Sequence, residues 1–262
     1  MAAEQSETTL RRGMSILFVL GTDEALDSRG LGVMRIAELV GREKSQISRT
    51  LKTLEACGLL SRDPESLHYR LSWEFFALAA RAGDHQIVEA APPILENLVS
   101  QLDETAYVTV LRGNEVLTIA AQDSARIVKA TGTLGRVTPG YCTSAGRALL
   151  MDHDDAQIRS LFRDVELVRH GPRTVKDVEE LVKRIQKGAR VGVAVADEEY
   201  EPGLVGIAAP VRDARSRIVA AVNVSGPKFR LQPRLEVACK EVAASAAALS
   251  RRLGAPIRSE RR

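Results

Sequence analysis

The stretch from Ile36 to Leu54, IAELVGREKSQISRTLKTL, decides how the first part of the chain folds. Its apolar residues recur at helical spacing in two runs, which Gly41 separates. Glycine accepts the left-handed backbone conformation that commonly ends a helix. The second run places Ile47, Leu51 and Leu54 on one face, at intervals of four and three residues. The pattern predicts two short helices joined by a tight turn, which is a helix-turn-helix.

The second of these helices leaves a polar face that contains no acidic residue. Arg and Lys can donate to guanine, Gln can pair with adenine, and hydroxyl groups can bond to phosphate, so such a face suits the major groove of DNA. An ordinary solvated helix face is the alternative interpretation. Together with Arg42 from the turn, the residues expected to contact DNA are Lys44, Ser45, Gln46, Ser48, Arg49 and Lys52.

The flanking sequence extends this motif to a winged helix-turn-helix domain over residues 8–72. A two-stranded hairpin directly after a recognition helix is the wing of such a domain, and Arg62 and Arg70 from it are expected to reach the DNA backbone or the minor groove. The predicted elements are a first helix, a loop rich in Asp, Ser and Gly, and the two wing strands, over residues 8–21, 23–32, 59–63 and 67–71.

Residues 73–102 are predicted to form a helical linker between the two domains. One apolar helical pattern runs over 73–82 and stops at Gly83, and a second runs over 85–102, where Pro92-Pro93 predicts a kink or a restart. Only 4% of the chain is aromatic, so a cluster of aromatic residues at the start of the linker favours a dimer or domain interface over a ligand site; its members are Trp73, Phe75 and Phe76.

The remaining sequence predicts an α+β domain over 103–254 and a basic tail over 255–262. Strands and helices are mixed without strict alternation, which favours a mostly antiparallel sheet. Strands are expected over 105–111, 116–121, 127–130, 191–196, 206–211 and 218–224. Helices are expected over 143–151, 154–162, 175–187 and 234–253. For the third helix we expect Thr174 as N-cap, Asp177 at the capping-box position and Gly188 at the far end.

Composition limits the class of protein. The chain has 262 residues, of which 45% are hydrophobic, so it can form ordinary packed domains. It shows no apolar run near the roughly 20 residues that span a bilayer, and its first ten residues do not resemble a signal peptide. The cysteines argue against a disulfide framework, and we find no metal-ligand spacing or nucleotide-binding loop. We therefore expect a cytoplasmic protein without membrane contact, metal or cofactor.

Charge gives only weak support for nucleic-acid binding. The net charge is +3, and residues 1–82 hold 11 Lys and Arg against 11 Asp and Glu. Affinity for DNA would then come from a local face with few phosphate contacts, which favours a dimer that reads two half-sites.

The order of the motifs along the chain resembles that of the IclR-type bacterial transcriptional regulators. The likeness extends over residues 8–253 and rests on several short runs in the right order. Besides the helix-turn-helix, these runs are LRRGMSIL at 10–17, CGLLSR at 57–62, YCTSAGRALL at 141–150, DEE at 197–199, GL at 203–204, IAAPV at 207–211 and AAVNVSGP at 220–227.

The resemblance implies an N-terminal winged helix, a dimerising linker helix and a GAF-like C-terminal domain that binds a small effector. It implies a regulator of a catabolic operon and not an enzyme, assembled as a homodimer or a dimer of dimers on double-stranded operator DNA. An enzyme that turns over a small acid, and a sensor module acting through protein partners only, are the rival functions.

In the second domain, Thr143-Ser144 stands where a loop becomes a helix. Hydroxyls and free backbone N–H groups there suit a carboxylate, although plain N-capping explains them equally well. The resemblance implies that this loop lines the effector cavity, which assigns to the cavity Gly140, Tyr141, Cys142, Thr143, Ser144 and Ala145.

Members that bind very small oxo-acids carry an acidic residue before the Asp-Glu-Glu run, a cysteine before the Ile-Ala-Ala strand and a Ser-x-Ser pair in the last strand. The matching positions are Ala196, Gly206, Asn223 and Ser225, so most depart from that pattern. A glyoxylate- or pyruvate-type ligand is therefore disfavoured. The run YCTSAGR also resembles members that respond to aromatic acids, and a small organic, aromatic carboxylic acid is the hypothesis.

Two other groups invite a chemical interpretation. Asp197-Glu198-Glu199 suggests a metal or acid–base site, but adjacent residues of a strand point to alternate faces, so solvated surface charge is favoured and a structural role is the next best interpretation. Cys142 suggests a nucleophile, but no motif supplies a histidine partner.

Overall fold

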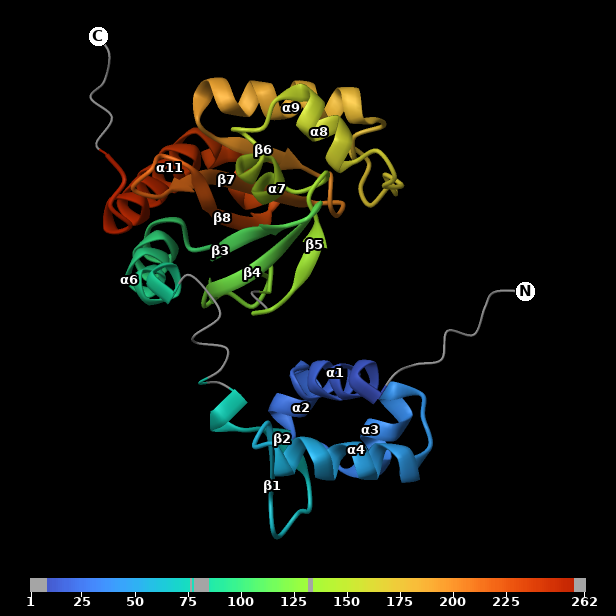
Figure 1. The fold of residues 1–262 in the computed structure, drawn as a ribbon. Helices are drawn as coiled ribbons and strands as arrows, with labels where there is room; N and C mark the ends of the chain where they lie inside the picture. The colour runs from blue at the N-terminus through green and yellow to red at the C-terminus, as the bar shows by residue number, and fades with distance from the viewer. Residues whose placement is uncertain (1–8, 76, 78–84, 132–133, 257–262) are drawn as a thin grey trace. The chain divides into compact units, whose positions relative to one another are not determined.

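The structure, a computed structural model, describes residues 9–75, 77, 85–131 and 134–256. The chain divides into two compact units, Met1–His85 and Gln86–Arg262 (Figure 1). The predicted stop at Gly83 and most of the predicted helix over 73–82 lie outside the described residues, as does most of the basic tail. Of that helix, residues 73–75 and 77 are helical.

The N-terminal unit is a small helical body with a hairpin. Its elements are α1 (Thr9–Leu20), α2 (Asp23–Asp27), α3 (Val33–Val40), α4 (Lys44–Ala56), β1 (Leu60–Arg62) and β2 (Tyr69–Leu71). The predicted helix-turn-helix is confirmed as α3 and α4, and Gly41 ends α3 with a φ of 68°. The predicted loop over 23–32 is partly wrong because it begins with α2, whose buried Ala25 joins the core.

The core of this unit explains the local pattern. Ile16 of α1, Ile36 of α3 and Ile47 and Leu51 of α4 are all completely buried. In the hairpin, Ser61 pairs with Arg70 in an antiparallel register, and Tyr69 forms a further bridge to Leu31. The wing therefore has a third stretch of chain beside it and does not stand as an isolated two-stranded ribbon.

Helix α6 (His85–Leu102) runs through Pro92 and Pro93 without a break, so the predicted restart is wrong. Both prolines are exposed, which leaves the neighbouring backbone carbonyls accessible to water. The opposite face is buried against the sheet, and its burial stabilises the helix despite the missing N–H donors. The buried residues of that face are Ile87, Ala91, Leu95, Leu98 and Leu102.

The C-terminal unit is built on an antiparallel sheet with the strand order β5-β4-β3-β8-β7-β6 (Figure 1). The strands are β3 (Thr105–Arg112), β4 (Glu115–Gln122), β5 (Val137–Pro139), β6 (Ala194–Asp197), β7 (Leu204–Arg212) and β8 (Ile218–Pro227). The strand predicted over 127–130 is absent, and β5 lies at the edge of the sheet instead. Ile127 and Val128 are 100% and 61% exposed, so they do not pack on a pleated surface.

Helices cover both faces of this sheet. One face packs against α6 and α11 (Leu235–Arg252), and the other against α7 (Ser144–Leu149), with α8 (Asp155–Leu161) and α9 (Val178–Val191) beside it. The short α10 (Lys228–Leu231) and a 3₁₀ turn (Gln232–Arg234) connect β8 to α11. Alternation along β7 places Ile207 and Ala209 toward α11 and Ala208 toward α7.

The ends of α9 differ from the prediction. Asp177, not Thr174, is the N-cap, and its side chain accepts from the Glu180 N–H. Gly192, with a φ of 75°, ends the helix in place of Gly188. A Cβ on Gly188 would lie 2.9 Å from Met151, so that glycine permits close packing inside the helix.

Candidate effector cavity and DNA-binding helix

A cavity of about 520 Å³ lies in the C-terminal unit. Its walls come from strands β3, β4, β7 and β8, from residues 128–131, from the start of α7 and from residues 200–203 before β7. Pockets that hold small molecules span roughly 300–1,000 Å³. The cavity is therefore large enough for a small organic ligand.

Most of the residues assigned to the effector site line this cavity. They are Cys142, Thr143, Ser144, Ala145, Ala196, Gly206, Asn223 and Ser225. They come together because the register pairs Gly206 of β7 with Ser225 of β8, while α7 packs across these strands. A Cβ on Gly206 would lie 2.8 Å from the Ser144 hydroxyl oxygen, so the glycine keeps this part of the cavity open.

Gly140 and Tyr141 do not line the cavity. The Tyr141 hydroxyl donates to the Val168 carbonyl at 3.0 Å, and its ring meets Phe162 edge-on at 6.5 Å. A Cβ on Gly146 would lie 2.1 Å from the Gly140 carbonyl oxygen. These residues hold the loop before α7 in place, since glycines at 140 and 146 let two backbone segments touch.

Thr143 combines a place on the cavity wall with a capping role. Its hydroxyl oxygen accepts from the Gly146 N–H at 3.2 Å, and the hydroxyl donates to the Pro139 carbonyl at 3.1 Å. Helix α7 therefore begins with an ordinary side-chain cap. Ser144 follows it at the wall, and its side chain is almost completely buried.

Cys142 is completely buried, and its sulfur lies 3.9 Å from the Pro139 carbonyl oxygen. Burial raises the pKa of the Cys142 thiol to about 12. The thiol therefore stays protonated at neutral pH, and it is a poor nucleophile.

The sequence analysis did not identify several cavity residues, because they come from strands and loops distant in sequence from the predicted ones. Tyr107 and Thr109 face the cavity from β3, where the period of two in the strand would have paired them. The Thr109 hydroxyl lies 3.3 Å from the Asn223 side-chain oxygen. Further wall residues of this kind are Thr118, Lys129, Arg136, Thr138 and Tyr200.

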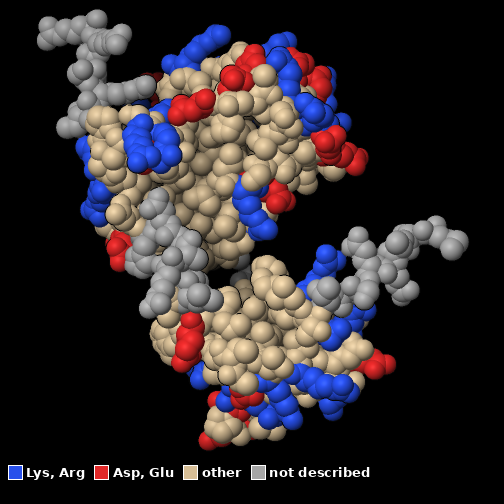
Figure 2. All heavy atoms as spheres, in the orientation of Figure 1, with Lys and Arg blue, Asp and Glu red and all other residues tan. Residues whose placement is uncertain are grey.

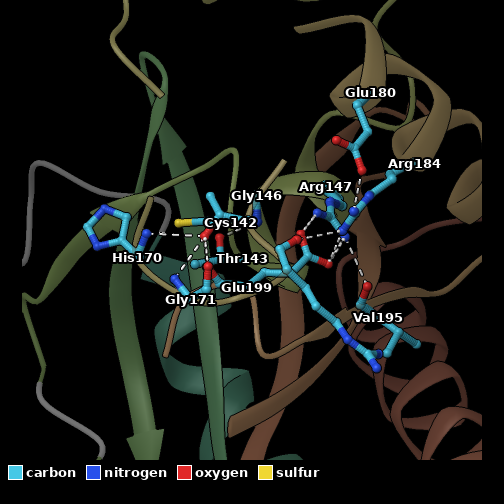
Figure 3. A network of polar contacts seen from close by, with 12 residues as sticks. Cys142, Thr143, Gly146, Arg147, His170, Gly171, Glu180, Arg184, Val195 and Glu199 are labelled. Atoms are coloured by element: carbon cyan, nitrogen blue, oxygen red, sulfur yellow. Dashed lines mark hydrogen bonds and ion pairs between the residues drawn. The ribbon is translucent and has the colours of Figure 1, made fainter. Parts of the chain in front are cut away.

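A buried ion-pair network lies beside the cavity (Figure 3). Arg147 of α7 and Glu199 are 2% and 3% exposed, and the Arg147 Nη1 lies 2.8 Å from the Glu199 Oε1. The second guanidinium nitrogen contacts the other carboxylate oxygen. Arg147 also donates to the Val195 carbonyl at 3.0 Å, and Arg184 of α9 reaches Glu199 at 2.7 Å.

The interpretation of residues 197–199 as solvated charge is therefore wrong for Glu199. Its carbonyl accepts from the Thr174 hydroxyl at 2.6 Å, which also explains why Thr174 does not cap α9. Glu198 has a φ of 54°, and Lys228 lies 2.9 Å from Asp197 and also contacts Glu198. The left-handed residue turns the chain so that strand alternation no longer applies, and each carboxylate has a basic partner.

In the N-terminal unit, α4 presents the polar face expected from the sequence. Figure 2 shows Lys and Arg side chains gathered along the part of this unit that carries α4. Ser48 is half-buried, whereas the other side chains expected to contact DNA are exposed: Arg42, Lys44, Ser45, Gln46, Arg49, Lys52, Arg62 and Arg70. In the wing, the Arg62 guanidinium lies over the Tyr69 ring at 5.2 Å, and Arg70 donates to the Ser61 hydroxyl at 3.2 Å.

Comparison with known families decides the class of this protein. Residues 9–64 match the IclR helix-turn-helix domain, and residues 79–251 match the bacterial transcriptional regulator IclR C-terminal domain. The chain belongs to the IclR family. The expected family, the α+β class and the helix-turn-helix are thereby confirmed, and this IclR-family protein is a DNA-binding transcriptional regulator and not an enzyme.

Curated relatives support the same assignment. The Pca regulon regulatory protein of Pseudomonas putida is 31% identical over 220 residues, which cover 83% of this chain and 74% of that protein. The HTH-type transcriptional regulator KdgR of Escherichia coli is 29% identical over 218 residues, which cover 82% of this chain and 83% of that protein.

Solved structures share the whole fold. The IclR transcriptional regulator from Alicyclobacillus acidocaldarius is 27% identical, with a TM-score of 0.76, and the match covers 94% of this chain and 98% of that one. An IclR homolog from Microbacterium hydrocarbonoxydans complexed with 4-hydroxybenzoate has a TM-score of 0.81 at 23% identity, covering 94% and 99%. No helix among the described residues is long and apolar enough to cross a membrane.

Proposed function

We propose that this IclR-family regulator controls a catabolic operon in response to a small aromatic carboxylic acid that binds in the cavity of the C-terminal unit. The observation that carries the proposal is the make-up of the cavity, about 520 Å³ in volume and lined by hydroxyl groups, an amide and tyrosine rings. Tyr107 and Tyr200 offer flat apolar surface to an aromatic ring. The polar wall residues offer hydrogen bonds to a carboxylate, and they are Thr109, Thr118, Thr138, Ser144, Asn223 and Ser225.

The size of the cavity argues against the smallest acids. Gly206 and Ala196 have no bulky side chain at the positions where the cavity meets β7 and β6. A very small oxo-acid would leave much of this volume unfilled and would make few contacts. A ligand with a ring fills it better, because buried apolar surface and close packing contribute most of the binding free energy.

On the DNA side, we propose that exposed residues of α4 read the operator. Gln46 and Arg49 are suited to base edges, and Lys52, Arg62 and Arg70 to phosphates. The face is small and only locally basic, so we propose that the active form is a homodimer or a dimer of dimers that reads two half-sites. Effector binding then changes operator affinity through the geometry of the paired winged helices.

The test combines calorimetry and a gel-shift assay on the full chain. Benzoate, 4-hydroxybenzoate, pyruvate and glyoxylate are titrated separately, and the DNA is the intergenic region upstream of the protein's own gene. We expect at least one aromatic acid to bind and to change the operator affinity. 4-Hydroxybenzoate is included because the similar Microbacterium hydrocarbonoxydans structure contains it. Binding of only pyruvate or glyoxylate would refute the aromatic assignment.

A further inference from the structure

Among the described residues, two basic side chains line the effector cavity, and they differ in whether a carboxylate neutralises their charge. Lys129 lies 2.9 Å from an Asp123 carboxylate oxygen and also donates to the Ser124 carbonyl at 2.8 Å. Its charge is therefore compensated within the protein. Arg136 forms no ion pair with any residue that the structure describes. The cavity thus has one guanidinium, within this part of the chain, whose charge is not neutralised by a carboxylate.

The backbone fixes the position of Arg136. The Thr118 N–H donates to the Arg136 carbonyl at 2.9 Å, and the Gly135 N–H donates to the Thr118 carbonyl at 2.9 Å. These bonds join the residues just before β5 to strand β4. Arg136 is therefore presented to the cavity from the edge of the sheet and not from a free loop.

Tyr200 fixes the guanidinium itself. The Arg136 Nη2 donates to the Tyr200 hydroxyl oxygen at 3.1 Å, and the Arg136 Cζ lies 5.8 Å from the centre of that ring. The Tyr200 ring in turn stacks on His170 at 5.6 Å. A neutral hydroxyl occupies one of the five N–H donors of the guanidinium, so the others remain able to hold both oxygens of a carboxylate.

We propose that Arg136 is the residue that recognises the negative charge of the effector, by a bidentate bond to its carboxylate, and that Tyr200 positions it. This inference rests on the proposed function, because it names the group that would select acids over neutral molecules of the same shape. Glu201 also lines the cavity and, like Arg136, is exposed, but it forms no ion pair with Arg136 in the part of the chain that is described. Glu201 therefore provides a control of opposite charge at the same cavity.

The experiment measures selectivity for an acid over its amide by calorimetry on the full chain. The probe pairs are benzoate with benzamide and 4-hydroxybenzoate with 4-hydroxybenzamide, which differ in charge and hardly in shape. In the wild-type protein we expect the acid to bind more tightly. Arg136→Gln should weaken acid binding about tenfold and leave amide binding unchanged, which removes the selectivity. Arg136→Lys should restore part of it, since it keeps the charge without the planar fork.

The controls separate this inference from the proposed function. Glu201→Gln removes a negative charge from the same cavity, so it should strengthen acid binding relative to amide binding, opposite in direction to Arg136→Gln; weaker acid binding would contradict the charge-based selection. The melting temperature of each variant checks that the fold is intact. If Arg136→Gln leaves acid binding unchanged, or weakens acid and amide equally, the inference is wrong and the proposed function stands. If the wild-type protein binds none of the acids, or binds the amides in preference, both the carboxylate assignment and the role of Arg136 are wrong.

Discussion

Arg147 and Glu199 form a two-point ion pair in which both side chains are at least 97% buried, between α7 and the chain that follows β6. The pair lies beside the cavity, since the wall residues Thr143 and Ser144 precede Arg147 and the wall residue Tyr200 follows Glu199. Fifty-two positions of sequence separate them. The pair therefore fixes the spacing of two cavity walls that the chain alone would not hold together.

Removing one partner of this pair should strongly destabilise the C-terminal unit. Glu199→Gln leaves the buried Arg147 without a carboxylate, and we expect a loss of about 3–5 kcal/mol in the free energy of unfolding, measured by urea denaturation. Arg147→Met should cost less, because Glu199 keeps its ion pair with Arg184. The double variant Arg147→Met with Glu199→Met should regain part of that loss, since no charge is then buried alone. A double variant less stable than either single one would contradict this account.

The exposed pair Lys240–Glu236 supplies the control for that experiment. Its nitrogen and oxygen lie 2.7 Å apart, but the side chains are 72% and 84% exposed. Water and salt screen such a pair, so Lys240→Ala should leave the urea midpoint essentially unchanged.

Gly206 leaves space in the cavity wall, and adding a side chain at this position tests whether the ligand occupies that space. Gly206→Ala places a Cβ 2.8 Å from the Ser144 hydroxyl oxygen, which must rotate, and Gly206→Val adds two methyl groups. We expect the affinity for 4-hydroxybenzoate to fall in the order Gly, Ala, Val, by about tenfold or more for Val, because the added carbons occupy ligand space. Calorimetry gives the affinities. Equal affinities across the series would mean that the ligand does not reach β7.

Arg49 of α4 should contribute directly to operator binding. It is exposed on the polar face, so Arg49→Ala should weaken operator binding by about 1–3 kcal/mol if the side chain contacts a base. A gel-shift series at several salt concentrations measures this, with random DNA as the reference. If Arg49 contacts only phosphate, the loss should be the same on both DNAs and Arg49→Lys should restore most of it. Unchanged affinity would remove Arg49 from the contact surface.

The cysteines should differ sharply in reactivity. Cys57 is exposed, whereas Cys142 is completely buried and its pKa is raised to about 12 by burial. At pH 8, iodoacetamide should modify Cys57 readily and Cys142 only after denaturation, as mass spectrometry of the digested protein will show. Rapid modification of Cys142 in the folded protein would contradict its placement in the core.

Burial of the Cys142 thiol also makes the free energy of unfolding depend on pH, and the raised pKa fixes the sign of this dependence. The thiol ionises in the unfolded chain near pH 8.5 but in the folded chain only near 12, so its contribution to stability is complete below pH 8.5 and is lost as the pH rises. Between pH 8 and pH 10 the wild-type protein should lose about 2 kcal/mol more than Cys142→Ala, measured by urea denaturation. Parallel losses in the two proteins would contradict the raised pKa.

The sequence was most informative where local rules and tertiary packing agree. Gly41 ends α3, and Ile47 and Leu51 form the buried face of α4, so spacing alone located the helix-turn-helix. The strand predicted over 127–130 was wrong because β-branched residues favour strands only where they can pack, and the Ile127 side chain is fully exposed. Strand alternation likewise could not foresee Glu199, because the left-handed Glu198 redirects the chain.

The cavity residues also divide into those that are neighbours in sequence and those that only the tertiary fold brings together. For neighbours in sequence such as Thr143 and Ser144, the local pattern fitted N-capping equally well, and the resemblance to the family assigned them to the cavity wall. Tyr107, Arg136 and Tyr200 meet there only because the sheet brings β3, the edge before β5 and the segment before β7 together, and nothing in their local sequences marks them. Tyr141 was misassigned, since a hydroxyl that bonds to Val168 looks the same in sequence as one that faces a ligand.

The uninterrupted course of α6 through Pro92 and Pro93 has a dynamic consequence. Two successive residues without an N–H remove two backbone hydrogen bonds from the ladder, so we expect the turns before residue 92 and those after it to open as separate cooperative blocks. The later block contributes three large side chains to the core, Leu95, Leu98 and Leu102, whereas the earlier block contributes Ile87 and the small Ala91. Opening of the first block therefore need not propagate into the second, and amide hydrogen exchange should be faster before the prolines than after them.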